Sequence, residues 1–120
     1  MGMAQRPVVL LVDDDPSMRD LLSNVFTLHG GFRIGGVCRD GFEAAMAASD
    51  LTPDIVVLDF FMPRWDGCKA AEYIRKACPN TKIVAFSAVL SEAPEWCDKF
   101  VLKTDIGDLV PMVEGLCTAA

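Results

Sequence analysis

Residues 7–15 read PVVLLVDDD, an uninterrupted apolar run that ends in three aspartates. Residues 55–59, IVVLD, repeat this arrangement, with Asp59 at the end. Short continuous runs of Val, Leu and Ile bounded by turn residues are typical of strands in a parallel sheet that is covered on both faces. Open α/β sheets bind their ligands at the carboxyl ends of the strands. We therefore expect the two acidic clusters to converge at one edge of a sheet.

Carboxylates gathered in one crevice need a cation between them. Two of them about 4 Å apart repel by about 4 kcal/mol at an effective dielectric constant of 20, and burial makes their ionisation harder still. Asp13, Asp14 and Asp59 are therefore predicted to bind a hard divalent metal.

The composition indicates one globular domain over residues 1–120. The chain has 52% hydrophobic and 23% charged residues, enough to bury about two thirds of its unfolded surface. Its apolar runs fall far short of the ~20 residues that span a bilayer, and its first residues lack the pattern of a secretion signal. We expect a cytoplasmic protein with no membrane partner.

The charged and sulfur-containing residues narrow the class of partner. A formal net charge of −6 disfavours direct binding to nucleic acid or to an anionic membrane, both of which require a basic patch. Five cysteines form no Cys-x-x-Cys pair, and the one histidine is His29, so reduced thiols are expected rather than disulfides or a zinc site. The expected partner is a protein.

Strands and helices alternate along the whole chain. Further strands are predicted over residues 32–38, 82–87 and 100–103, and helices over residues 16–29, 41–49, 66–77 and about 106–117. Parallel neighbours need helical crossovers. The fold class is therefore α/β, with a single doubly wound, five-stranded parallel sheet.

This strand order brings together side chains suited to phosphoryl transfer. Asp13 and Asp14 end the first strand, Asp59 the third, Ser87 the fourth and Lys103 the fifth. Asp59 can attack phosphorus without a general base, Lys103 and a metal can neutralise the equatorial oxygens, and Ser87 can donate a hydrogen bond to one of them. Each residue alone has a structural explanation, such as a helix cap or a solvated lysine, but the joint arrangement favours a site.

With these residues in place, the chain resembles the receiver domain of two-component response regulators over nearly its whole length. The match lies in the acidic pair, in residues 59–67 (DFFMPRWDG), in Ser87 with the small residue after it, and in Lys103. The resemblance implies a flavodoxin-like fold and Asp59 as the phosphoacceptor. It also implies Mg²⁺ as the cofactor, which agrees with the preference of this ion for an oxygen-rich shell.

The same resemblance implies how the metal is held. Asp14 and Asp59 would bind Mg²⁺ directly, together with the main-chain oxygen of Phe61, and Asp13 would act largely through water. A histidine kinase or a histidine phosphotransfer protein would donate the phosphoryl group, and a downstream protein would be the target. The chain would catalyse only its own phosphorylation and dephosphorylation.

Two further roles follow from the resemblance. Ser87 and Phe100 fall on the positions that switch the family's output surface, and Phe61 and Val89 fall on the positions that tune the lifetime of the aspartyl phosphate. Because Phe61 and Val89 are apolar, they cannot orient an attacking water, and we expect slow hydrolysis.

The chain also departs from the family pattern. Lys103 is followed by Thr104 instead of proline, and it lies only sixteen positions after Ser87, so the fourth helix is expected to be short, irregular or missing. Trp96 and Phe100 in this shortened segment are either core residues or a docking patch. Two alternatives remain, a degenerate receiver that is a phosphate-independent interaction module, and a phosphohydrolase acting on a small substrate.

Overall fold

The computed structural model describes residues 6–88 and 92–118. It contains a five-stranded sheet in the order β2-β1-β3-β4-β5, and every neighbouring pair is parallel. In chain order the elements are β1 (Val8–Val12), α1 (Pro16–His29), β2 (Arg33–Cys38), α2 (Gly41–Leu51), β3 (Ile55–Leu58), α3 (Gly67–Ala77), β4 (Lys82–Ser87), β5 (Lys99–Leu102), the 3₁₀ helix η1 (Lys103–Asp108) and α4 (Leu109–Thr118). This confirms the predicted α/β class and the parallel sheet.

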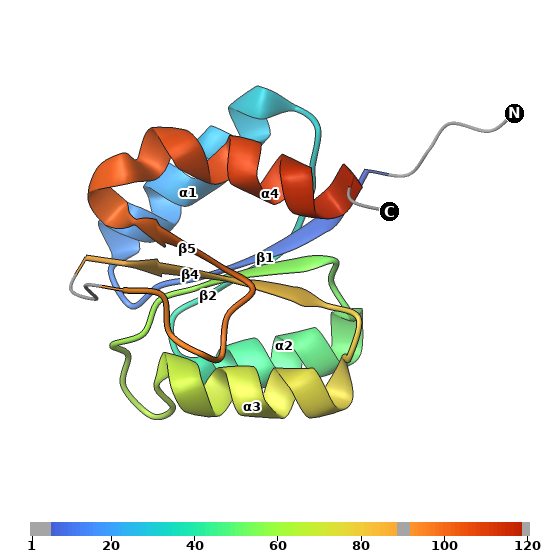
Figure 1. Cartoon of the computed structure of the whole chain (residues 1–120), viewed down its shortest axis with the longest axis vertical. Helices are drawn as coiled ribbons and strands as arrows, with labels where there is room; N and C mark the ends of the chain where they lie inside the picture. The colour runs from blue at the N-terminus through green and yellow to red at the C-terminus, as the bar shows by residue number, and fades with distance from the viewer. Residues whose placement is uncertain (1–5, 89–91, 119–120) are drawn as a thin grey trace, which may run out of the picture.

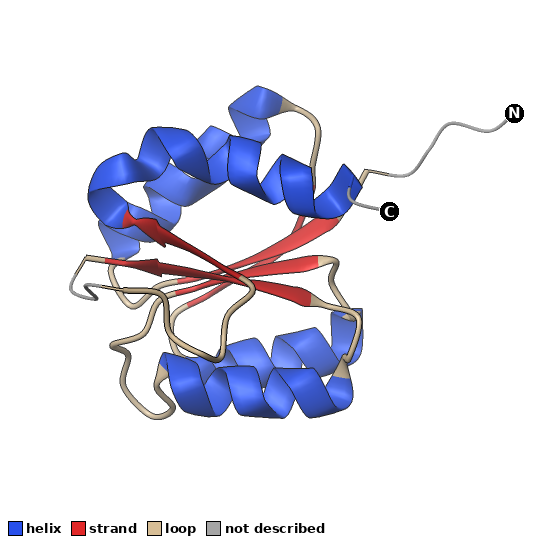
Figure 2. Ribbon diagram, viewed as in Figure 1, coloured by secondary structure: helices blue, strands red, loops and turns tan. Residues whose placement is uncertain are grey.

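The helices cover both faces of the sheet, with α1 and α4 on one side and α2 and α3 on the other (Figure 1). Figure 2 shows the sheet as the middle layer between them. Along β1, Val9 and Leu11 pack into the core on the α1 and α4 side, and Leu10 and Val12 pack into the core on the α2 and α3 side. Both faces are buried, which explains why this strand is apolar at every position.

Local sequence signals fix the ends of α1. Asp15 is the N-cap, and its side chain accepts a hydrogen bond from the Ser17 amide at 3.0 Å, with Pro16 in the first helical position. Gly30 ends the helix in the left-handed conformation, with φ at 80°. The third aspartate therefore caps the helix, and Asp13 and Asp14 remain available to the crevice.

The expected last helix begins later than predicted. Residues Lys103–Asp108 form η1, and the α-helix starts at Leu109 instead of near Ile106. Asp105 leaves the helical region, with φ −106° and ψ 35°, and Gly107 lies in the poorest non-proline class of helix formers. Lys103, which was assigned to the fifth strand, is the first residue of η1.

No helix lies between β4 and β5 among the described residues of that connection, 88 and 92–98. The prediction of a short, irregular or missing fourth helix is thereby confirmed. The chain here bends toward α3 (Figure 1). Asp98 binds β4, because its amide donates to the Ile83 carbonyl at 2.8 Å and its carboxylate accepts from the Ile83 amide at 2.7 Å. Trp96 and Cys97 pack against the core on the α2 and α3 side.

Across residues 6–88 and 92–118, none of the helices has both the length and the apolar character that crossing a lipid bilayer requires.

Candidate functional site

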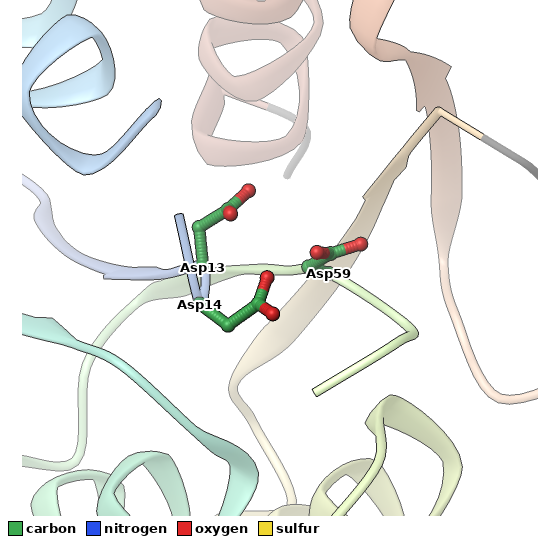
Figure 3. A group of neighbouring side chains, drawn as sticks. All are labelled: Asp13, Asp14 and Asp59. Carbon is green, nitrogen blue, oxygen red and sulfur yellow. The ribbon is translucent and has the colours of Figure 1, made fainter. Parts of the chain in front are cut away.

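The register of the sheet brings the two acidic clusters side by side. Val12 at the end of β1 pairs with Leu58 at the end of β3, and the Asp59 amide donates to the Val12 carbonyl at 3.2 Å. Figure 3 shows the Asp13, Asp14 and Asp59 side chains projecting from these neighbouring strand ends into one space. One carboxylate oxygen from each residue lies within 4.8 Å of the others. The predicted convergence is confirmed.

The three carboxylates differ in their exposure to solvent. Asp13 is fully buried and Asp59 is 5% exposed, whereas Asp14 is exposed. Oδ1 of Asp13 accepts from the Asp15 amide at 2.9 Å, and Oδ1 of Asp59 accepts from the Phe60 amide at 2.8 Å. The main chain thus holds two of the carboxylates in place, and the third faces solvent.

Lys103 links the two buried carboxylates. Its Nζ lies 2.7 Å from Oδ2 of Asp13 and 3.2 Å from Oδ2 of Asp59. Burial lowers the pKa of this lysine, but the hydrogen bonds and the charges of the two aspartates outweigh burial and leave its pKa above the ordinary value. Lys103 is therefore a permanent cation at neutral pH.

Asp59 carries an unusual pKa for a carboxyl group. Burial raises its pKa to about 6, and the charge of Asp13 adds to this effect, against the opposing charge of Lys103 and the hydrogen bonds that Asp59 accepts. The group is therefore mostly ionised at neutral pH, as a nucleophile requires, and becomes protonated in mildly acidic solution.

The donor set fits a hard divalent cation. Oδ2 of Asp13 is fully buried and faces the Lys103 ammonium at 2.7 Å, so one ammonium serves two buried carboxylates and leaves negative charge for a further cation. The cluster offers only carboxylate oxygens, and the exposed Asp14 leaves one side open to the waters that Mg²⁺ retains when it binds proteins.

The remaining predicted site residues are Ser87, Phe100, Phe61 and Val89. Ser87 is buried at the end of β4 and pairs in register with Leu102, the residue before Lys103. Phe100 is half-buried on β5. Phe61 is 57% exposed, and its ring meets the Phe60 ring edge-on with 4.6 Å between centroids. Val89 lies outside the described residues.

An ion pair beside the crevice was not predicted from the sequence. Arg64, in the loop between β3 and α3, has φ at 64°, in the left-handed region that non-glycine residues rarely occupy. Its Nε and Nη2 atoms both lie 2.9 Å from Oδ2 of Asp40, the N-cap of α2, and its guanidinium lies over the Phe42 ring. The capping role of Asp40 was readable from Glu43 three residues later, but its pairing with Arg64 was not.

Trp65 and His29 have partners outside this cluster. Trp65 contacts the Phe42 and Tyr73 rings of α2 and α3, at 5.3 Å and 5.7 Å between centroids. His29, at the carboxyl end of α1, lies with Nε2 3.1 Å from Oε2 of Glu114.

Comparison with known families gives a match that covers most of the chain. The family described as the response regulator receiver domain matches residues 9–97. The chemotaxis protein CheY of Thermotoga maritima is 39% identical over 85 residues, which cover 71% of this chain and 70% of that protein.

A larger relative and a solved structure give the same match. The protein-glutamate methylesterase/protein-glutamine glutaminase of Thermotoga maritima is 33% identical over 84 residues, which are 70% of this chain but 24% of the relative. This chain therefore spans about a quarter of that protein's length. The crystal structure of the response regulator TrrA from Thermotoga maritima, in complex with Mg²⁺-BeF, superposes with a TM-score of 0.83 at 29% identity and covers 92% of this chain and 98% of its own.

Proposed function

This chain belongs to the response regulator receiver family and acts in phosphorelay signalling, and from that premise we propose that Asp59 accepts a phosphoryl group from a phosphohistidine partner in a Mg²⁺-dependent reaction. One observation supports this most strongly. Lys103 Nζ contacts both Asp13 and Asp59 at the edge of a cluster of three carboxylates, so a nucleophile, a fixed cation and a metal-binding oxygen set share one crevice.

The chemistry follows from the positions of these groups. A carboxylate oxygen of Asp59 attacks phosphorus, an O–P bond forms, and the P–N bond to the donor imidazole breaks while that nitrogen takes up a proton. Lys103 balances charge on the transferred group from one side, and Ser87 supplies a hydroxyl at the end of β4. Mg²⁺ would be held by Asp14 and Asp59, by the main-chain oxygen of Phe61 and, through water, by Asp13, and it would supply further positive charge.

The proposed partners follow from the same chemistry. A histidine kinase or a histidine phosphotransfer protein is the donor, and a protein that binds one phosphorylation state of this domain is the target. Ser87 and Phe100 are proposed to report that state to the output surface, with the chain acting on no external substrate.

The comparisons do not support the alternative of a degenerate, phosphate-independent module. The family match covers residues 9–97, which include the acidic pair, Asp59 and Ser87, and Lys103 lies in contact with the buried pair in the structure.

Intact-mass measurement tests the proposal. The protein is incubated with Mg²⁺ and acetyl phosphate beside an Asp59→Asn control. Gain of one phosphoryl group is expected, and both the Asn substitution and chelation of the metal should abolish it. A folded wild-type protein that gains no mass at any Mg²⁺ concentration would contradict the proposal.

A further inference from the structure

The loop that follows Asp59 is in contact with an aromatic residue from the connection between β4 and β5. Resting on the function proposed above, we propose that Trp96 is a positioning residue for this loop, and that the contact makes the segment 92–98 respond to what is bound at Asp59. This segment belongs to the connection between β4 and β5, in which the described residues form no helix.

The first contact is at the residue next to the phosphoacceptor. The Trp96 ring stacks on the Phe60 ring, with 6.1 Å between centroids and 13° between planes. The Phe60 amide is the donor to Oδ1 of Asp59 at 2.8 Å. Trp96 therefore contacts the residue that directly follows the phosphoacceptor and binds its carboxylate.

The second contact is at the far end of the same loop. The Gly67 amide donates to the Phe60 carbonyl at 2.8 Å, which closes the loop onto the start of α3. A side chain at Gly67 would meet the Asp59 carbonyl and the Trp96 ring, because a Cβ built there lies 2.8 Å from the first and 3.1 Å from the second. Trp96 thus packs against both the beginning and the end of the loop.

Trp96 is itself anchored. Nη2 of Arg75, on α3, donates to the Trp96 carbonyl at 2.9 Å and lies 3.1 Å from Oδ2 of Asp98. The Asp98 carboxylate also accepts from the Ile83 amide on β4. The main chain at Trp96 is therefore held from α3 and, two residues later, from β4, so the ring projects from a fixed base against the loop that follows Asp59.

Coupling of this kind acts in both directions. Suppose that ligand binding at Asp59 changes the packing free energy of Trp96. Removing the Trp96 side chain must then change the binding free energy of that ligand by the same amount. A stacked aromatic pair stabilises its geometry by more than the burial of its surface alone. Loss of the Trp96–Phe60 pair should therefore change the affinity for the ligand at Asp59 about threefold to tenfold.

Fluorescence tests the response of Trp96. The chain has two tryptophans, so Trp65→Phe leaves Trp96 as the reporter. Adding Mg²⁺ and beryllofluoride, a tetrahedral mimic of a phosphoryl group, is expected to change the emission of Trp96. The same titration of the Trp65→Phe, Asp59→Asn protein should leave the emission unchanged.

Substitution tests the positioning role. Trp96→Ala is expected to weaken Mg²⁺ binding and slow phosphorylation by acetyl phosphate about threefold to tenfold, and Trp96→Phe should restore most of both. Leu28→Ala is the control, because Leu28 is an exposed apolar residue of α1, on the opposite face of the sheet from the Trp96 contact (Figure 1). It should leave both quantities unchanged.

The outcomes separate this inference from the proposed function. The inference is overturned if the wild type is phosphorylated but the emission of Trp96 does not respond, and if a folded Trp96→Ala variant keeps the wild-type Mg²⁺ affinity and phosphorylation rate. The proposed function would still stand. A wild-type protein that acetyl phosphate does not modify would overturn the function itself. Circular dichroism of each variant establishes that the comparison is between folded proteins.

Discussion

At the residue scale, the defining feature is a pair of buried carboxylates that share one ammonium group. Asp13 and Asp59 contribute two negative charges and Lys103 one positive charge, so the buried part of the site has one uncompensated negative charge. Burial is the main cause of the rise in the pKa of Asp59 to about 6, and the charge of Asp13 adds to it against the opposing charge of Lys103. The uncompensated charge favours a further cation beside the pair.

The raised pKa predicts a pH dependence of stability in metal-free solution. The folded-state pKa of Asp59 is about 6 and the ordinary value is 3.8, so between these values the folded state binds more protons and stability falls as pH rises. Asp59→Asn cannot ionise, and should therefore exceed the wild type in free energy of unfolding by about 3 kcal/mol near neutral pH.

Urea unfolding in the presence of a chelator measures this difference. It should be largest above about pH 6 and shrink below about pH 4, where Asp59 is protonated in both folded and unfolded chains. If the difference in free energy of unfolding stays constant across this pH range, ionisation of Asp59 is not the cause of the difference.

Phe61 provides the second residue-scale prediction. Its side chain is largely exposed and has no polar group to hold an attacking water. Phe61→Asn should speed loss of the phosphoryl group from Asp59 about tenfold, a modest share of what a full general base supplies. Following the phosphorylated mass after donor removal gives the rate, with Phe61→Leu as the apolar control. Equal rates in the Asn and Leu variants would contradict the proposed role.

At the element scale, the loop between β3 and α3 depends on a residue in a strained conformation. Arg64 is left-handed and paired with Asp40 of α2. Arg64→Gly and Arg64→Ala both lose this ion pair, but only glycine adopts the conformation without strain. We expect the Gly variant to be about 1 kcal/mol more stable than the Ala variant.

Thermal or urea unfolding of the two variants measures this effect, and Arg39 supplies the matched control. Arg39 is an exposed arginine with its own ion pair to Glu43, and it is not among the described residues with positive φ. The Arg39→Gly variant should be no more stable than the Arg39→Ala variant. The same order of stability at both positions would rule out backbone strain as the explanation.

The elements themselves could be predicted wherever local signals act alone. The apolar runs at residues 8–12 and 55–58 became β1 and β3, and Asp15 with Gly30 set the ends of α1. The start of α4 was missed, because the break at Asp105 leaves no clear signal in the sequence. The Arg64–Asp40 pair spans 24 residues, and such pairing depends on how the two loops meet in three dimensions.

At the scale of the whole molecule, the candidate site could be predicted because it depends on topology. Parallel strands place their carboxyl ends at one edge, so the sequence alone predicts that Asp13, Asp14, Asp59, Ser87 and Lys103 share that edge. The short interval between Ser87 and Lys103 predicted that the fourth helix is short, irregular or missing. That Trp96 would stack on Phe60 could not be predicted, since it depends on the path of a loop with no regular structure.

Metal binding should stabilise the entire fold. A ligand that binds only the folded state at about ten times its dissociation constant adds about 1.4 kcal/mol to the free energy of unfolding. Asp14→Asn should abolish this gain while leaving the metal-free protein as stable as the wild type, because Asp14 is exposed. Thermal unfolding with and without Mg²⁺ measures both effects. If Mg²⁺ stabilises the Asp14→Asn variant as much as the wild type, Asp14 is not a ligand of the metal.

Lys103 has a consequence for how this molecule senses its ionic surroundings. Its ammonium is a counter-ion tethered to the chain, and it lies beside both buried carboxylates. A dissolved cation that approaches these carboxylates meets a resident positive charge and is repelled by it. A monovalent cation would therefore be attracted only weakly, whereas a doubly charged one would keep a larger net attraction to the cluster.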